Sequence, residues 1–368
     1  MKVPYNYLPM QFQNQNEILA DWKKLIESTE FTLGPYVESF EKQFAEFIGC
    51  KHVIGTNTGT DALILALKAI GVEPGDEVIS VPVTFYATIG AIVAVGAKPV
   101  FVDIDERYQM DSKLVKKAIT SKTKAILPVH WGGAAPNIES IMQIADDNNL
   151  KVVEDACMAP GGYINNKHAG TFGHANAWSM HPLKPLNVMG DGGMVSTDDD
   201  DLAHWMHMYR NHGMVDRNHN SIWGVNMRLQ PLQAIVASHI IKTVDETVDK
   251  RNLNANLIDE GLKSLFPHVK TPPRPEGYKE TYSLYMAQFE RRDELLNYLI
   301  DKEIEAKVHY PVPLHLQEAA KYLGYKQGDF PVSEAYCEKI LTLPAHQFIS
   351  NEQIEFMLEQ IAKFYKEI

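Results

Sequence analysis

Residues 52–70 read HVIGTNTGTDALILALKAI: a short β-branched run, a turn rich in threonine and glycine, and an apolar stretch of helical length. We expect a strand over 52–55 and a helix over 61–70. The same alternation continues between about residues 45 and 197. It predicts further strands at 77–81, 99–102, 125–129 and 152–153, and further helices at 86–95 and 138–148. Strands alternating with helices indicate βαβ units and an α/β fold with a mostly parallel sheet.

The pattern changes after residue 248. A helix is expected over 253–266, followed by a proline-rich linker at 272–277 and then by alternating strands and helices of α+β type up to residue 368. A chain of 368 residues is long enough for two domains. The sequence therefore predicts a large domain over 1–247, including an N-terminal arm, and a smaller C-terminal domain over 248–368.

Charge and composition exclude several classes of function. The chain has 35 basic and 47 acidic residues, a net charge of −12, and no basic run, so neither nucleic acid nor an anionic membrane is expected as a partner. Its three cysteines form no CxxC pair, which indicates a reducing compartment. The apolar run 87–97 is shorter than the roughly 18 residues of a membrane span. We expect a cytoplasmic protein without a membrane segment.

Two strand ends carry groups that could bind a ligand. Gly59 and Thr60 lie where a strand leads into a helix, and a helix N-terminus presents free N–H groups to a phosphate. The alternative is that Thr58 or Thr60 only caps the helix. Asp155 follows the apolar strand at 152–153, at its carboxyl end. A buried carboxylate there would need a cationic or hydrogen-bonding partner, such as a protonated ring nitrogen. An ordinary loop carboxylate is the alternative.

Lys184 lies in an apolar stretch bounded by Pro182 and Pro185, before a glycine turn at 190–193. Desolvation lowers the pKa of a lysine and makes its amine a nucleophile that can form a Schiff base. A solvated surface lysine is the alternative. His204 and His207 could share one helix face, but no carboxylate or cysteine lies at ligand spacing, so no metal site is predicted.

A phosphate turn, a strand-end Asp and then a lysine some thirty residues later are the groups that pyridoxal phosphate chemistry requires. The chain also resembles the DegT/DnrJ/EryC1/StrS family of sugar aminotransferases, nearly from end to end. The motifs that carry the resemblance are LGP at 33–35, TGTDAL at 58–63, PVTFYAT at 82–88, EDA at 154–156, SMHPLK at 179–184, GVNMR at 224–228 and YPVPLH at 310–315. The resemblance implies the type I fold of aspartate aminotransferase, with pyridoxal 5'-phosphate bound by the large domain.

The resemblance also implies residue roles. Lys184 would link to the cofactor and later move a proton between the substrate carbon and the cofactor, and Asp155 would keep the pyridinium nitrogen protonated. The residues implied to bind the cofactor are Gly59, Thr60, Phe85, Asp155, Ser179, Lys184 and Asn226. Phe85 would stack on the ring, while Gly59, Thr60 and Ser179 would hold its phosphate. Asn226 would reach the phosphate of a neighbouring subunit, which implies a homodimer with shared active sites. Tyr310 and His315 are candidates for substrate binding.

One position departs from the family pattern. Many relatives have Gln or His three residues after the Asp, whereas this chain has Met158. A thioether cannot donate a hydrogen bond to the phenolic oxygen of the cofactor. The donor at that oxygen is therefore either missing or supplied by a backbone N–H or a water.

The implied activity is transfer of an amino group from L-glutamate to a keto-sugar. The run Leu183-Lys184-Pro185-Leu186-Asn187 most resembles enzymes that make 8-amino-3,8-dideoxy-manno-octulosonate, a lipopolysaccharide sugar, from the 8-keto form of 3-deoxy-manno-octulosonate. A nucleotide-linked 3-keto or 4-keto deoxyhexose is the alternative acceptor. Dehydratases of the same family have another residue at the lysine position, so Lys184 argues against that activity. A reading of another class is a non-catalytic regulator that binds an amino sugar on the same scaffold.

Overall fold

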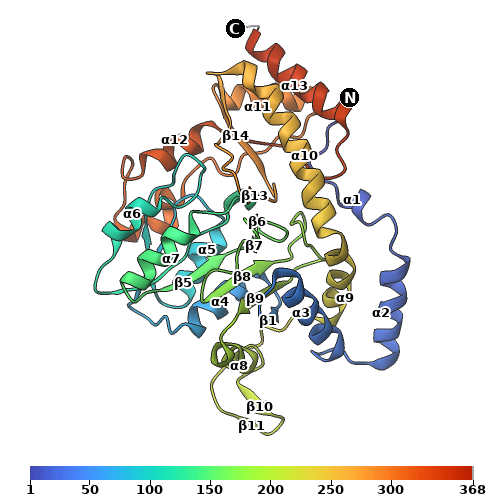
Figure 1. Ribbon diagram of the computed structural model, residues 1–368, viewed down its shortest axis with the longest axis vertical. Coiled ribbons are helices and arrows are strands. Elements are labelled where there is room, and N and C mark those ends of the chain that lie inside the picture. Colours follow the sequence, from blue (N-terminus) through green and yellow to red (C-terminus); the bar gives the residue numbers. More distant parts are fainter. Residues whose placement is uncertain (367–368) are drawn as a thin grey trace.

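A seven-stranded sheet forms the centre of the protein, which we describe from a computed structural model for residues 1–366 (Figure 1). The strands lie in the order β1 (His52–Thr56), β9 (Gly193–Thr197), β8 (Ala175–Ser179), β5 (Lys151–Asp155), β4 (Thr123–Ile126), β2 (Glu77–Ser80) and β3 (Lys98–Phe101). Only β9 runs against its neighbours, and the other strands are parallel to one another. The predicted α/β fold with a mostly parallel sheet is confirmed.

Helices cover the sheet. Helix α4 packs on β8 and β9, α7 packs on β4 and β5, and α3 packs on β1 and on α9. The helices that precede the last third of the chain are α1 (Leu8–Gln11), α2 (Asn16–Ser28), α3 (Pro35–Ile48), α4 (Gly59–Ala69), α5 (Tyr86–Ala94), α6 (Ser112–Ala118), α7 (Ile138–Asp147), α8 (Asp200–Tyr209) and α9 (Pro231–Ile240). Because both faces are covered, β2 and β8 are buried along their whole length.

The C-terminal part builds a second, smaller sheet. It contains β12 (Val269–Lys270), β14 (Tyr285–Phe289) and β15 (Ile340–Leu343), all antiparallel. Its helices are α10 (Val244–Leu262), α11 (Arg292–Asp301), α12 (Pro331–Lys339) and α13 (Asn351–Lys366). The remaining short strands are β6 (Tyr163–Ile164), β7 (Lys167–His168), β13 (Tyr278–Lys279) and the hairpin of β10 (Met214–Asp216) and β11 (His219–Asn220). Figure 1 shows the smaller sheet with α11 and α13 above the central sheet, beside both chain termini, and the β10–β11 hairpin below it.

Helix α10 connects the two hydrophobic cores. Val244 and Val248 pack in the core around the central sheet, whereas Ala255 and Ile258 pack in the core of the smaller sheet. The predicted division after residue 247 therefore falls inside a helix. The N-terminal arm crosses this division as well, because Val3 is buried in the second core and pairs with Ile304.

The observed boundaries differ from the predicted ones for identifiable reasons. Helix α4 begins at Gly59, two residues early, because the Thr58 hydroxyl accepts the Asp61 N–H and caps it. Strand β4 ends at Ile126 and not at residue 129, because Pro128 has no N–H to continue the ladder. The acidic run at 198–201 begins helix α8, whose cap is Asp199.

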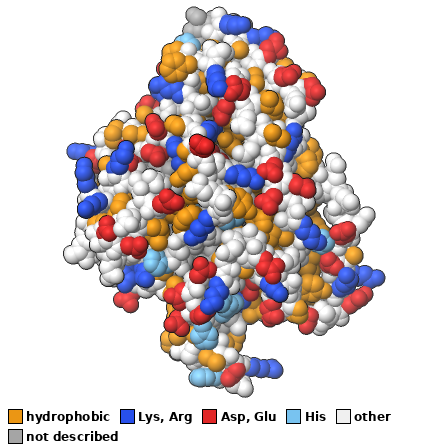
Figure 2. All heavy atoms as spheres, viewed as in Figure 1, with side chains coloured by type: hydrophobic (Ala, Val, Ile, Leu, Met, Phe, Trp, Pro, Cys, Tyr) orange, Lys and Arg blue, Asp and Glu red, His pale blue; other side chains and the backbone are white. Residues whose placement is uncertain are grey.

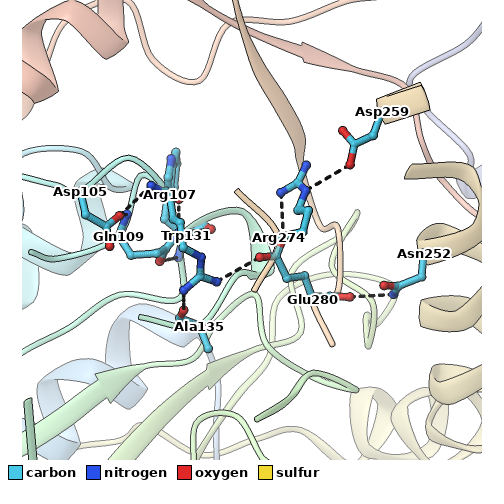
Figure 3. Close-up of polar contacts among 9 residues, drawn as sticks. All are labelled: Asp105, Arg107, Gln109, Trp131, Ala135, Asn252, Asp259, Arg274 and Glu280. Carbon is cyan, nitrogen blue, oxygen red and sulfur yellow. Dashed lines mark hydrogen bonds and ion pairs between the residues drawn. The ribbon is translucent and has the colours of Figure 1, made fainter. Parts of the chain in front are cut away.

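Ion pairs centred on the buried Glu280 connect the two parts of the chain (Figure 3). Glu280 is 6% exposed and accepts Arg107 Nη2 at 3.1 Å and Arg274 Nη1 at 2.9 Å. Arg274 Nε also contacts Asp259 of α10 at 3.2 Å. Arg107 belongs to the loop after β3, so Glu280 joins the first core to the linker between β12 and β14 of the smaller sheet.

We predict that Glu280→Gln lowers the free energy of unfolding by roughly 1.5–3 kcal/mol, because Arg107 would lose its carboxylate partner and Arg274 would keep only Asp259. Urea unfolding measures the change. The matched control is Glu318→Gln, which removes an exposed pair with Lys321 and should change stability by less than about 1 kcal/mol. Equal effects of the two variants would contradict a stabilising role for the network.

Candidate functional site

Strand direction places several loops together. Strands β1, β8, β5, β4 and β2 are parallel, so their carboxyl ends lie at one edge of the sheet, where ligands bind in open α/β folds. A cavity of about 450 Å³ opens at this edge. The predicted site residues that line it are Gly59, Thr60, Phe85, Asp155, Ser179, Lys184 and Tyr310, and Met158 joins them.

The start of α4 forms a cradle for an anion. Gly59 and Thr60 lie in the first turn, where backbone N–H groups have no acceptor within the helix. A Cβ on Gly59 would come within 2.7 Å of the Ser179 Cβ, so only glycine lets the turn approach that serine. Thr58 caps the helix, as the alternative interpretation proposed, and the adjacent N–H groups stay available.

Asp155 has hydrogen-bond partners but no cationic one. Its carboxylate is 6% exposed and accepts the Thr88 hydroxyl at 2.7 Å and the Cys157 N–H at 3.3 Å. The Thr88 hydroxyl in turn contacts that of Thr84 at 2.7 Å. Within residues 1–366 no basic side chain forms an ion pair with Asp155. A buried carboxylate held in this way can pair with a cationic group of a ligand.

Lys184 lies in a constrained turn after β8. The preceding residue, Leu183, has a φ of +75°, a left-handed backbone conformation that residues other than glycine rarely adopt. The Lys184 carbonyl accepts Asn187 Nδ2 at 2.8 Å and the Tyr7 hydroxyl at 3.3 Å. Burial lowers the pKa of the Lys184 ammonium, and the charge of Asp155 opposes that shift. The amine is therefore more easily deprotonated than that of a surface lysine.

The structure adds cavity residues that the sequence did not indicate. His130 is fully buried with Nε2 2.7 Å from Glu154 Oε2, and its Nδ1 has no partner in the described chain. His309 lines the same cavity, and burial together with the charge of Lys184 lowers its pKa to about 4. Trp131, Tyr5, Tyr7, Tyr282, Arg251 and His346 also contribute. They come from the N-terminal arm, a loop and the second core, and no local motif marks them.

Two predicted residues lie outside the cavity. Asn226 is exposed, and its Oδ1 accepts Arg228 Nε at 2.9 Å. His315 is buried against the Phe330 ring, and its Nε2 is 3.1 Å from Glu334 Oε1. A single chain therefore does not bring these two side chains to Lys184.

Other kinds of site have little support. Residues 1–366 contain no group of three or more His, Cys, Asp or Glu side chains that could hold a metal ion. In the same described range, no helix is long and apolar enough to cross a membrane. Figure 2 shows acidic and basic side chains interspersed over the viewed face, unlike the continuous basic surface that binds nucleic acid.

Comparison with known proteins identifies the family. The model of the DegT/DnrJ/EryC1/StrS aminotransferase family matches residues 13–362. The chain belongs to this family. The match covers nearly the whole chain, including both cores and every residue of the cavity except the N-terminal arm.

Relatives from this family align over nearly their full length. The chain is 39% identical to the "Pleiotropic regulatory protein" of Geobacillus stearothermophilus, covering 100% of this chain and 99% of that protein. It is 36% identical to UDP-N-acetyl-3-dehydro-alpha-D-glucosamine 3-aminotransferase of Acidithiobacillus ferrooxidans, covering 92% and 91%. The crystal structure of S. venezuelae DesV in complex with a ketimine intermediate superposes with a TM-score of 0.96 at 33% identity, covering 99% and 98%.

The family makes this protein a sugar aminotransferase that depends on pyridoxal phosphate. The residues present fit that cofactor. The cradle at Gly59 suits its phosphate, Asp155 is a buried carboxylate without a cation, and the free Nδ1 of His130 is an unsatisfied polar atom in the cavity wall. The predicted enzyme class and cofactor are confirmed.

Proposed function

We propose that this aminotransferase moves an amino group from L-glutamate to a nucleotide-linked keto-hexose. The observation that carries the reaction is the meeting of the Gly59 cradle, Asp155 and Lys184 in one cavity. The relative from A. ferrooxidans, which is named for a UDP-linked keto-sugar substrate, supports this class of acceptor. Octulosonate, which the run at 183–187 suggested, finds no such support among these relatives.

Each cavity residue has a defined task in this reaction. The N–H groups of Gly59 and Thr60 and the Ser179 hydroxyl would hold the cofactor phosphate, and Phe85 would pack on the ring. Thr88 donates a hydrogen bond that holds the Asp155 carboxylate, which would pair with the ring nitrogen of the cofactor. When bound, the cofactor supplies an electron sink for the substrate carbanion. Lys184, with its lowered pKa, takes the proton from the substrate carbon and returns it.

A panel of acceptors tests the substrate class. The protein is incubated with glutamate and, separately, with 3-keto and 4-keto nucleotide sugars and with the 8-keto form of 3-deoxy-manno-octulosonate. Mass spectrometry of the products should show amination of a nucleotide-linked sugar. Amination of octulosonate alone would contradict the proposed acceptor.

We predict that Lys184→Ala abolishes transamination and leaves the protein folded, because no other amine in the turn can replace it. The loss should appear as the absence of glutamate-driven bleaching of the visible absorbance band. Circular dichroism and melting temperature check the fold. Full turnover with an unchanged visible band would show that Lys184 is not the cofactor lysine. A visible band that glutamate does not bleach in the wild type would instead favour the regulator.

We also predict a homodimer in which Asn226 completes the site of the neighbouring subunit. Asn226 is exposed and lies three residues after Trp223, which is 90% exposed next to the β10–β11 hairpin. Mixing inactive Lys184→Ala with an inactive Asn226→Ala variant should restore up to one intact site per mixed dimer, once subunits exchange. Sedimentation of the active enzyme as a monomer would refute the shared site.

A third prediction concerns Met158, which lines the cavity at the position where the family resemblance led us to expect Gln or His. In Met158→Gln the new amide can donate to the phenolic oxygen of the cofactor and draw charge from it. The pKa of the visible absorbance band should therefore fall. A pH titration of both proteins measures it. An unchanged pKa would mean that another donor, a backbone N–H or a water, already serves that oxygen, and a rise would contradict the argument.

A further inference from the structure

Arg251 is a buried charge without a carboxylate partner. Three arginines are less than 9% exposed in the described chain, namely Arg210, Arg251 and Arg292. Arg210 pairs with Glu41 and Arg292 pairs with Asp293. Arg251 is 1% exposed and forms no ion pair with any residue in 1–366. Burying an unpaired charge costs free energy, and Arg251 lies in the wall of a ligand cavity. A ligand with a negative charge would offset that cost.

The contacts of Arg251 leave part of its guanidinium free. Nε donates to Gln347 Oε1 at 3.0 Å, Nη1 to the Tyr282 carbonyl at 3.4 Å and Nη2 to the Tyr7 hydroxyl at 2.8 Å. A guanidinium has five N–H donors, so one on each terminal nitrogen has no protein acceptor. Two such donors match the two oxygens of a carboxylate.

The surroundings favour an anion at this end of the cavity. The Tyr7 hydroxyl links Arg251 to the carbonyl of Lys184, so the guanidinium lies two hydrogen bonds from the lysine backbone. His346 also lines the cavity, and burial lowers its pKa to about 4, so it is neutral at pH 7 and the positive charge at this end comes from Arg251. The carboxylate of Asp155 belongs to the other wall, at the end of β5.

We propose that Arg251 binds a carboxylate of the amino donor, L-glutamate, through the free N–H groups of its guanidinium. The proposal rests on the proposed function, in which every acceptor sugar uses the same donor. A sugar acid such as octulosonate would present the same chemistry, and the experiment separates the two sources. The proposal makes Arg251 a residue that selects the donor.

The test uses the cofactor-loaded protein and glutarate, a dicarboxylate that cannot react. Calorimetry should show that Arg251→Gln raises the glutarate Kd roughly 10-fold to 100-fold, as expected for losing hydrogen bonds to a charged group. Gln347→Glu keeps the guanidinium and its contact but supplies an internal carboxylate. It should also weaken glutarate binding several-fold, which a purely structural Arg251 would not explain.

Arg292→Gln is the matched control, because it removes a buried arginine that does not line the cavity. Its glutarate Kd should stay at the wild-type value. Unchanged glutarate binding in folded Arg251→Gln, or in Gln347→Glu, would overturn the proposal. So would a loss of affinity for keto-octulosonate with the glutarate Kd unchanged, which would assign the carboxylate to the sugar. Failure of the proposed function is seen separately, as a wild-type visible band that glutamate does not bleach.

Discussion

The common direction of six strands is the constraint on which the site depends. All strands of the central sheet except β9 end at the same edge, so the loops that follow them converge although they are far apart in sequence. The antiparallel β9 lies between β1 and β8 and keeps those two parallel to each other. This arrangement places the turn at Gly59, the carboxylate of Asp155 and the Ser179 hydroxyl around one cavity.

The sheet supplies only one wall, and the second wall depends on how the two cores are joined. Glu280 holds Arg107 from the first core and Arg274 from the linker, and the chain then continues into Tyr282 and Tyr285 of the cavity. The charges of Glu280, Arg107 and Arg274 are balanced by one another and by Asp259. Arg251, in the same wall, is the exception, because its charge has no carboxylate partner in the described chain. The paired charge of Glu280 stabilises the fold, whereas the unpaired charge of Arg251 is free to bind a ligand.

The N-terminal arm links this wall to the lysine. The Tyr7 hydroxyl contacts both Arg251 and the carbonyl of Lys184, and Gln11 forms amide hydrogen bonds with Asn187. These contacts support a turn in which Leu183 has a left-handed backbone. Surrounding structure that fixes such a conformation is a common feature of functional sites. The arm is therefore part of the cavity, although it precedes the first strand by some forty residues.

The sequence by itself determined most of the central elements and several groups that follow them. Hydrophobic periodicity predicted five of the seven strands of the central sheet but not β8 or β9. The glycine turn, the strand-end Asp155 and the apolar setting of Lys184 were predictable because each depends on neighbouring residues. The tertiary structure alone decided what faces these groups. The cavity wall includes Arg251, His130 and Tyr7 but not His315. The positions of these side chains depend on the packing of distant segments, for which local sequence carries no signal.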